Sequence, residues 1–291
     1  MNSLKLSNLD KIYWPEENYT KKDLIDYYVE IQDFILPHLK NRPVSMNRFP
    51  DGIYGKHFYQ KDTGNLNLPD WVPTICVNGT SYILCQNAEV LIYIANLGSI
   101  EINVWNSRAS NLDHPDFLVL DLDPVEIGFE VVVETAQHLK TVLDEIGLTA
   151  FIKTSGMSGL HIYVPTGGEY DYEQLKQLAK LIAAVAHSRF PRFTSIERLE
   201  KKRVGKVYID YLQNNKAQTM AAPYSVRPVQ GANVSTPLLW EELNGQLSPN
   251  KFNIENVPAR LYKIGDPFKE ALDCKGFEME SVLTKLKEVI L

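Results

Sequence analysis

The segment Phe117–Pro124, with the sequence FLVLDLDP, constrains the fold of this chain more than any other stretch. Its four apolar residues lead into two aspartates, and the proline predicts that a buried strand ends there. Successive side chains of a strand point to opposite faces, so Asp121 and Asp123 share one face. Two neighbouring carboxylates repel each other, and a divalent cation removes that repulsion. The segment therefore predicts a metal site, with aspartates that merely cap a loop as the alternative.

Composition limits the class of protein. The 291 residues are 44% hydrophobic and 23% charged, which supplies material for a core and argues against disorder. A net charge of -6 argues against indiscriminate nucleic-acid binding, although a local basic groove remains compatible with it. The three cysteines are too few for a disulfide framework or a zinc site. No apolar stretch reaches the roughly 20 residues that span a bilayer, so we expect a cytoplasmic protein without a membrane partner.

Hydrophobic periodicity predicts a mixture of helices and strands in one compact domain with a smaller amino-terminal lobe. The predicted strands are 82–86, 100–105, 150–154, 160–164 and 207–212, and residues 42–52 are predicted to form a short strand that runs into a turn. The predicted helices are 21–37, 88–97, 129–146, 172–189 and 278–289. Thr20 and Asp171 are expected to cap two of the helices at their amino-terminal ends, and Pro37 is expected to end or kink the first helix.

Two later features can join the aspartate strand in one site. The loop 155–159 is rich in glycine and serine, and its backbone N–H groups can face phosphates, with Ser155 and His161 as side-chain donors. Asp210 supplies a third carboxylate on a further strand. Phosphoryl transfer to a 3′-hydroxyl uses two cations about 4 Å apart, which three carboxylates can hold. The alternatives are an ordinary hairpin turn and a histidine that is satisfied in the core.

Aromatic and basic residues alternate between Lys56 and Lys61. Such a mixture suits base stacking beside phosphate contacts. Aromatic residues in a strand are nevertheless more often part of a hydrophobic core, and this alternative stays open.

A phosphatase is the alternative hypothesis for the class of enzyme. The sequence from Asp121 to Val125 also fits phosphatases of the haloacid-dehalogenase type, with Asp121 as nucleophile, Asp123 as general acid and one magnesium ion. Thr154 or Ser155 would then be the later hydroxyl residue. These enzymes usually carry a paired acidic motif late in the chain, whereas Asp210 is followed by a tyrosine.

Several motifs together resemble the polymerase domain of bacterial ATP-dependent DNA ligase D, in the archaeo-eukaryotic primase superfamily. The resemblance covers the chain from Asn8 to Phe268. It rests on the motifs DLDP at 121–124, KTSGxxGLH at 153–161, YIDYL at 208–212, RP at 42–43, RxPDG at 48–52, FYQK at 58–61 and APYSxR at 222–227. It implies an α+β primase-polymerase-like fold with a central mixed or antiparallel sheet flanked by helices.

The resemblance also implies roles for individual residues. The metal ligands and catalytic residues would be Asp121, Asp123 and Asp210, holding two Mn²⁺ or Mg²⁺ ions. The nucleotide and its triphosphate would contact Ser155, His161, Gln213, Arg227 and Asn103. DNA would contact Phe58, Tyr59 and Lys61, and the 5′-phosphate at the far side of a gap would contact Asn8, Lys11 and Lys21. The alternative for Lys11 and Lys21 is that both are solvated surface charges.

For the whole protein, the resemblance implies template-directed addition of nucleoside triphosphates, ribonucleotides preferred over deoxynucleotides, to gapped or broken duplex DNA. It implies repair by non-homologous end joining alongside Ku and a DNA ligase, in a nucleoid-associated cytoplasmic protein. Residues 1–110 would bind the DNA end, and residues 111–291 would form the catalytic core. A DNA-end-binding module with a decayed active site is the non-enzymatic alternative, and the three retained aspartates argue against it.

Two positions depart from the family pattern. Asn103 stands where related domains often carry a histidine near the nucleotide. Ser158 stands where a loop lysine often meets phosphate, and loss of such a contact costs roughly 1.5–3 kcal/mol at most. Both departures bear on nucleotide affinity rather than on the chemistry.

Overall fold

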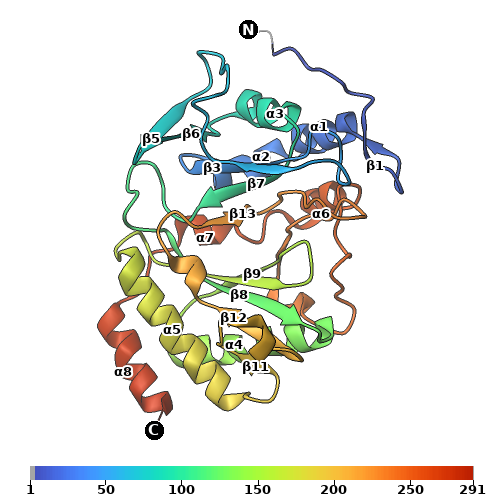
Figure 1. The fold of residues 1–291 in the computed structure, drawn as a ribbon. Coiled ribbons are helices and arrows are strands. Elements are labelled where there is room, and N and C mark those ends of the chain that lie inside the picture. Colours follow the sequence, from blue (N-terminus) through green and yellow to red (C-terminus); the bar gives the residue numbers. More distant parts are fainter. Residues whose placement is uncertain (1–3, 291) are drawn as a thin grey trace. The chain divides into compact units, whose positions relative to one another are not determined.

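The computed structural model describes residues 4–290, which combine helices with antiparallel and mixed sheets and confirm the predicted α+β class (Figure 1). The chain forms two compact units, each made of separate stretches of sequence. Unit 1 comprises residues 1–110, 219–236 and 250–266, and unit 2 comprises residues 111–218, 237–249 and 267–291. The assignment of the whole chain to one primase-polymerase domain stays a prediction.

Unit 1 is built on a six-stranded sheet in the order β13-β7-β3-β6-β5, with β4 paired to β3. The strands of this sheet are β3 (Pro43–Arg48), β4 (Phe58–Gln60), β5 (Thr74–Val77), β6 (Thr80–Leu84), β7 (Ser99–Trp105) and β13 (Thr219–Ala221). Its helices are α1 (Lys21–Glu30), α2 (Gln32–Leu39), α3 (Ala88–Asn96) and α6 (Val257–Ile264). The short strands β1 (Ile12–Trp14) and β2 (Tyr19–Thr20) form a separate pair.

Unit 2 contains a second six-stranded sheet in the order β11-β12-β8-β10-β9-β14. The strands are β8 (Phe117–Val125), β9 (Phe151–Thr154), β10 (Leu160–Pro165), β11 (Thr194–Ser195), β12 (Lys206–Asp210) and β14 (Pro237–Leu238). The helices are α4 (Phe129–Glu145), α5 (Tyr172–Arg189), α7 (Lys269–Asp273) and α8 (Met279–Ile290). Only the β11–β12 pair in this sheet is parallel, so the sheet is mixed as expected.

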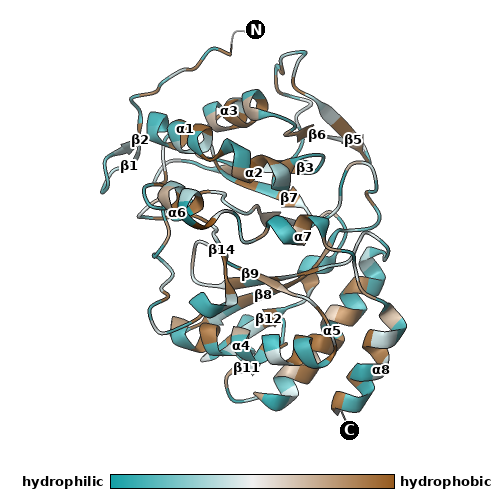
Figure 2. Ribbon diagram, turned by 180° about the vertical axis from the view of Figure 1, so that it is seen from behind, coloured by the Kyte–Doolittle hydropathy of each residue, from teal (hydrophilic) through white to brown (hydrophobic). Residues whose placement is uncertain are grey.

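The two faces of β8 have different neighbours because side chains alternate along a strand. Leu118, Leu120 and Leu122 are fully buried, and α4 and α5 pack on the sheet with their own buried apolar residues. Figure 2 shows β8 and β9 as hydrophobic and the two helices as mixed in hydropathy. The leucines therefore anchor the strand in the core, while the alternate positions, Asp121 and Asp123, belong to the other face.

The prediction that Pro124 ends the strand was wrong, because β8 continues to Val125. The carbonyl of Val125 accepts a hydrogen bond from Gly205, on the β12 side of the strand. The N–H and C=O groups of successive strand residues point to opposite sides. Because the carbonyl of Val125 points towards β12, the backbone nitrogen of Pro124, which carries no hydrogen, points away from β12. The pairing with β10 already ends at Leu122 on that side, and the proline therefore removes no ladder hydrogen bond.

The first predicted helix is two helices, and the break lies at Ile31 rather than at Pro37. Ile31 is fully buried with non-helical dihedral angles (φ -99°, ψ 9°), so tertiary packing sets the break. Pro37 is accommodated inside α2. The predicted caps are confirmed, since both Thr20 and Asp171 form capping boxes.

The strand predicted at 207–212 ends earlier, at Asp210, and Leu212–Asn214 forms a 3₁₀ turn. Among the helices of residues 4–290, none is long and apolar enough to cross a bilayer.

Candidate functional site

Four polar residues form one row across the sheet of unit 2. Asp210 on β12 is the direct cross-strand partner of Asp121 on β8, and Asp121 is in turn the partner of His161 on β10. His161 is the partner of Lys153 on β9. Side chains at directly opposed positions point to the same face of a sheet. The backbone pairing therefore brings two predicted carboxylates and the predicted histidine together.

Asp123 lies in the next row on the same face, opposite Tyr208. Gly159 follows this row towards β10, and a Cβ atom there would be 2.3 Å from the carbonyl oxygen of Leu122 and 3.7 Å from Asp123 Oδ1. Only glycine allows the loop to approach β8 this closely. The GxxG pattern of the sequence thus has a steric reason beside the aspartate strand.

The 3₁₀ turn after β12 holds Gln213 against both carboxylates. Gln213 Nε2 is 3.5 Å from Asp121 Oδ2 and 3.3 Å from Asp210 Oδ2. Asp210 Oδ1 also accepts the backbone N–H of Leu212 at 2.7 Å and the Tyr208 hydroxyl at 3.3 Å. Burial, followed by the charge of Asp210, raises the pKa of Tyr208, so this phenol stays a donor. Gln213 was predicted at the nucleotide, and the structure adds these contacts to the carboxylates.

Asn214 positions this turn, and sequence reasoning missed it. Its Oδ1 accepts the N–H of Val119 at 2.8 Å, and its Nδ2 donates to the Val119 carbonyl at 2.7 Å. The side chain thereby continues the ladder on β8 beyond the end of β12. An asparagine four residues after the last position of β12 gave no signal in the sequence.

The loop between β9 and β10 is closed by Ser155. Its Oγ accepts the backbone N–H groups of Met157 and Gly159, each at 3.0 Å, and its own N–H donates to the Gly159 carbonyl at 3.0 Å. The side chain therefore shapes the loop that the sequence assigned to phosphate binding. Three of the five backbone N–H groups that were predicted to face phosphates, those of Ser155, Met157 and Gly159, therefore donate within the loop.

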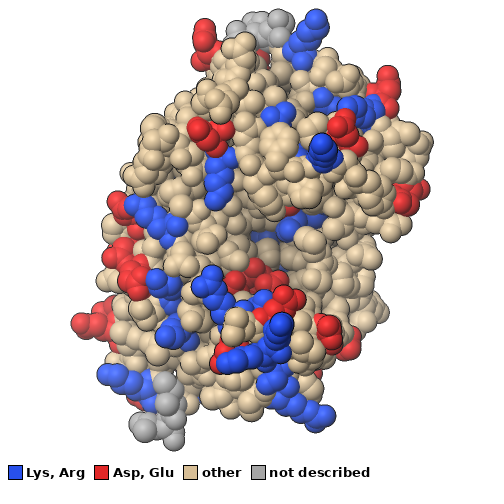
Figure 3. Space-filling model, in the orientation of Figure 1, with Lys and Arg blue, Asp and Glu red and all other residues tan. Residues whose placement is uncertain are grey.

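A basic segment adjoins the carboxylates. A pocket of about 360 Å³ is lined by Arg198, Arg203, Tyr208, Asp210, Leu212, Gln213, Asn215 and Gln218. On the face of unit 2 seen in Figure 3, lysine and arginine side chains gather around acidic ones. Residues 189–206 contain seven Lys or Arg and two Glu, which is a net +5 (7 - 2) in a chain of net -6. This charge run was the available signal for Arg198 and Arg203, and sequence reasoning missed it.

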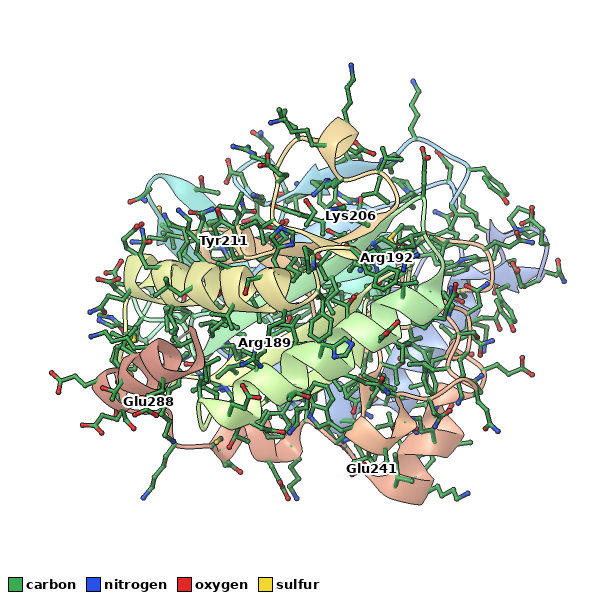
Figure 4. The ribbon with its side chains drawn as sticks, turned by 90° about the horizontal axis from the view of Figure 1, so that it is seen from below. Arg189, Arg192, Lys206, Tyr211, Glu241 and Glu288 are labelled. Atoms are coloured by element: carbon green, nitrogen blue, oxygen red, sulfur yellow. The ribbon has the colours of Figure 1, made fainter. Side chains whose placement is uncertain are left out.

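Two cations of this segment serve structural contacts on another part of the unit. Arg189 Nη1 is 2.7 Å from Glu145 Oε2, where the ends of α5 and α4 meet, and Lys206 Nζ donates to the Pro191 carbonyl at 2.8 Å. Figure 4 labels Arg189, Arg192 and Lys206 around this end of α5. The cations that line the pocket are accordingly Arg198 and Arg203.

The carboxylate group fits hard divalent cations by its chemistry. Oxygens of Asp121 and Asp210 converge on one amide nitrogen, that of Gln213, and Asp123 shares their face. Carboxylate oxygens are the ligands that Mg²⁺ and Mn²⁺ prefer. Within residues 4–290 no three His, Cys, Asp or Glu side chains form a ready metal cage. The Gln213 amide lies between the two carboxylates, so its displacement would be part of metal binding.

The residues predicted at a 5′-phosphate lie together in unit 1. Lys11 Nζ donates to the Pro50 carbonyl at 3.0 Å and to Asp51 Oδ1 at 2.7 Å, and Lys21 Nζ donates to the Ser7 carbonyl at 2.8 Å. The backbone N–H of Lys21 also donates to the carbonyl of Lys11. Burial first, and then the charges of Lys11 and Arg48, lower the pKa of Lys21 to about 8.

Asn8 closes the same loop, because its carbonyl accepts the N–H of Lys11 at 3.2 Å. A left-handed backbone (φ 53°) makes this turn possible, and asparagine tolerates that conformation. Unit 1 therefore gathers all three predicted residues, with Arg48 as a further cation close to Lys21.

Phe58 and Tyr59 lie on β4 and are 45% and 60% exposed, so neither side chain is in the core. As neighbours on a strand they point to opposite faces. The guanidinium of Arg48 lies 5.2 Å from the centre of the Phe58 ring. Partial burial of the Tyr59 hydroxyl, followed by the charge of Glu101, raises the pKa of Tyr59, and the charge of Arg227 lowers it. The two rings therefore belong to two different surroundings. Lys61 follows the strand and is exposed.

Asn103 and Arg227 lie in unit 1, close to Glu101. Arg227 Nε is 3.7 Å from Glu101 Oε2, and Asn47 Nδ2 donates to the same oxygen at 3.1 Å. Asn103 is two residues from Glu101 on β7 and is 4% exposed. Its Nδ2 has no hydrogen-bond partner among residues 4–290. Sequence reasoning missed this buried polar face, because apolar and polar residues alternate in 100–105 as they do in a strand with one exposed face.

The fold is that of a primase-polymerase domain. The chain belongs to the family of LigD primase-polymerase domains, whose model matches residues 20–268. It is 36% identical over 267 residues to the bifunctional non-homologous end joining protein LigD of Bacillus subtilis (strain 168), covering 91% of this chain and 43% of that protein. It is 34% identical over 273 residues to the multifunctional LigD of Pseudomonas aeruginosa PAO1, covering 92% of this chain and 32% of that protein.

A solved structure is similar throughout. The polymerase domain from Mycobacterium tuberculosis ligase D in complex with DNA matches with a TM-score of 0.86 and 28% identity, over 94% of this chain and 100% of that one. These findings confirm the predicted resemblance and the predicted fold. The chain spans less than half the length of the curated relatives it matches.

Proposed function

We propose that this protein is a template-directed nucleotidyltransferase that extends 3′ ends and fills gaps in broken DNA during non-homologous end joining. The observation that carries the proposal is the cross-strand pairing of Asp210 with Asp121, with Asp123 on the same face of the same strand. Family membership supports the general role, since the relatives are named as end-joining proteins. Three carboxylates on neighbouring strands are the group that such a reaction needs.

In the proposed reaction, a 3′-hydroxyl oxygen forms a bond to the α-phosphorus of a nucleoside triphosphate. The bond between that phosphorus and the bridging oxygen breaks, and pyrophosphate and a proton leave. Asp121, Asp123 and Asp210 would hold two Mn²⁺ or Mg²⁺ ions, and the chemistry that such ions supply is activation of a hydroxyl and neutralisation of charge on a leaving group. Ser155, His161 and the remaining loop amides hold the triphosphate.

The other groups recognise DNA and nucleotide. Lys11, Lys21 and Asn8 bind a downstream 5′-phosphate, which carries about 1.5–2 negative charges. Phe58, Tyr59 and Lys61 contact bases and backbone. Arg227 and Asn103 contact the nucleotide. Ribonucleotide preference, manganese preference, cooperation with Ku and a DNA ligase, and a nucleoid-associated cytoplasmic location complete the proposal.

Primer extension on a gapped duplex tests the function. The substrate carries a downstream 5′-phosphate, and reactions compare rNTPs with dNTPs and manganese with magnesium. The proposal predicts template-dependent addition, faster with rNTPs and with manganese. Absence of extension under all four conditions would contradict it, as would addition that ignores the template base.

The same preparation separates the alternatives. A haloacid-dehalogenase-type phosphatase would hydrolyse a generic phosphomonoester and extend nothing. A decayed end-binding module would bind the gapped duplex and show neither activity. The cross-strand position of Asp210 favours the polymerase over the phosphatase, because the third carboxylate comes from β12 and not from a paired acidic motif.

A further inference from the structure

Lys153 is a fully buried lysine at the end of the polar row in unit 2, and none of the roles described above uses it. Burial of an ammonium group is costly unless the group is hydrogen-bonded. Lys153 Nζ is 2.8 Å from His161 Nδ1, and the ammonium also lies 5.8 Å from the centre of the Tyr163 ring. A methionine or leucine would fill this place in the core more cheaply, so the position of the ammonium calls for a function.

The contact constrains where His161 carries its proton. In its ammonium form Lys153 has three donors and no acceptor, so His161 Nδ1 is then the acceptor of this contact. In a neutral imidazole the hydrogen then resides on Nε2. Nε2 is 3.3 Å from Asp121 Oδ1. The contact of Lys153 with Nδ1 therefore determines that His161 directs an Nε2–H group towards Asp121.

We propose that Lys153 is a positioning residue, which holds the His161 ring with Nδ1 accepting and Nε2–H directed towards Asp121 and the space beside it. A partner at the second ring nitrogen commonly fixes the tautomer and orientation of a functional histidine. The inference rests on the proposed function, because the role of His161 as a donor to the triphosphate belongs to that function.

The cross-strand positions of Lys153, His161 and Asp121 explain why a long side chain at position 153 can reach the His161 ring. Lys153, His161 and Asp121 are direct partners on β9, β10 and β8, so the backbone ladders fix their order. The ring is 4% exposed and touches partners at both nitrogens. Without the ammonium, Nδ1 would face the interior without that donor, and rotation of the ring would move Nε2–H away from Asp121. A misplacement of about 1 Å in a site of this kind can cost about 100-fold in rate.

The direct test is nitrogen-15 NMR of the imidazole of His161 in the unmodified protein. The sample is free of divalent cations and held at one pH near 7.5, and His161→Gln identifies the resonances. We expect a non-protonated, hydrogen-bonded Nδ1 and a protonated Nε2. A protonated Nδ1 would overturn the inference. The measurement needs no activity and no folded variant, so it stands apart from the primer-extension test of the proposed function.

Variants connect the contact to the reaction. Lys153→Met keeps the stem and removes the donors, and Lys153→Arg keeps the donors. Lys140→Met is the control, because Lys140 pairs with Asp144 on α4 and touches no residue of the site. We expect Lys153→Met to shift the Nδ1 resonance and to lower kcat for nucleotide addition about ten-fold or more, with a smaller change in KM. Lys153→Arg should restore both in part, and Lys140→Met should change neither.

The outcomes separate positioning from packing. If Lys153→Met lowers only the Tm and leaves the Nδ1 resonance and kcat per folded molecule unchanged, the inference is wrong. If Lys153→Met does not fold, the resonances of the unmodified protein still decide. If the unmodified protein shows the expected tautomer but extends no primer, the proposed function fails and the structural inference stands.

Discussion

Asp121 on β8 and Asp210 on β12 are direct cross-strand partners, although 88 positions of sequence separate them (210 - 121 - 1). Opposed Cβ atoms in an antiparallel pair lie about 4.5–5.5 Å apart, so the backbone ladder sets the spacing of the two carboxylates. Fully buried leucines hold β8 from the other face. The two carboxylates therefore rest on paired strands of the sheet rather than on loops, and we expect changes to the residues that support these strands to alter the position of the carboxylates.

Asn214 is the first such support. Asn214→Ala would leave the N–H and carbonyl of Val119 without the partners that Asn214 provides, and each unsatisfied buried group costs about 1–3 kcal/mol. We expect a loss of about 2–4 kcal/mol in unfolding free energy from urea denaturation. Asn215→Ala is a suitable control, because the Asn215 side chain donates to the Leu212 carbonyl and accepts from Lys176 at a half-buried turn, and neither contact reaches β8. Equal stability of the two variants would contradict the role assigned to Asn214.

The Ser158 position should tune nucleotide affinity. Ser158 is exposed in the loop between β9 and β10, so a longer side chain fits there without repacking. Ser158→Lys should lower KM for the nucleotide about ten-fold, since one charge-assisted contact is worth about 1.5 kcal/mol. Ser158→Gln supplies length without charge and should have little effect. Unchanged KM in the lysine variant would argue against phosphate binding by this loop.

Binding of a 5′-phosphate should weaken as pH rises through about 8. The pKa of Lys21 is lowered to about 8, mainly by burial, so the ammonium form prevails at pH 7 and the neutral form at pH 9. Only the ammonium attracts phosphate, whose second pKa of about 6 leaves its charge constant over this range. The affinity advantage of phosphorylated over hydroxyl-ended gapped DNA should fall several-fold from pH 7 to pH 9 at fixed salt. A constant or rising advantage would contradict a role for Lys21.

The two aromatic residues of β4 should have separable effects. Phe58 lies beside Arg48, and Tyr59 lies where Glu101 and Arg227 act on it. Phe58→Ala should weaken binding of gapped DNA by about 1–3 kcal/mol, as expected for one lost base stack. Tyr59→Ala should mainly raise KM for the nucleotide. Titration of fluorescent DNA and steady-state kinetics measure the two effects, and identical profiles for both variants would contradict the division.

Local patterns predicted the individual pieces of this site. Alternation in FLVLDLDP placed Asp121 and Asp123 on one face, and the glycine loop with His161 was recognised from turn residues and periodicity. The helix caps at Thr20 and Asp171 were also readable, because a capping box is a local interaction. The residues that could be predicted owe their conformation to near neighbours in the sequence.

Long-range pairing could not be predicted in the same way. The register that aligns Asp210, Asp121, His161 and Lys153 depends on contacts between distant strands. The continuation of β8 through Pro124 depends on where β10 ends, and the break at Ile31 depends on its burial. Arg198 and Arg203 escaped notice because a charge run usually marks a solvated surface.

The rate of single-nucleotide addition by Asp210→Asn tests whether the three aspartates form the catalytic metal site. The change keeps the volume of the side chain and removes the carboxylate, and Asp144→Asn on α4 is the matched control because Asp144 pairs with Lys140 at the surface. Both variants should bind gapped DNA like the unmodified protein. The account predicts that Asp210→Asn loses about 1,000-fold or more in the rate of addition, as expected when a shared metal site loses a ligand, whereas Asp144→Asn stays within about two-fold. Addition by Asp210→Asn within a few-fold of the unmodified rate would contradict the assignment of the three aspartates.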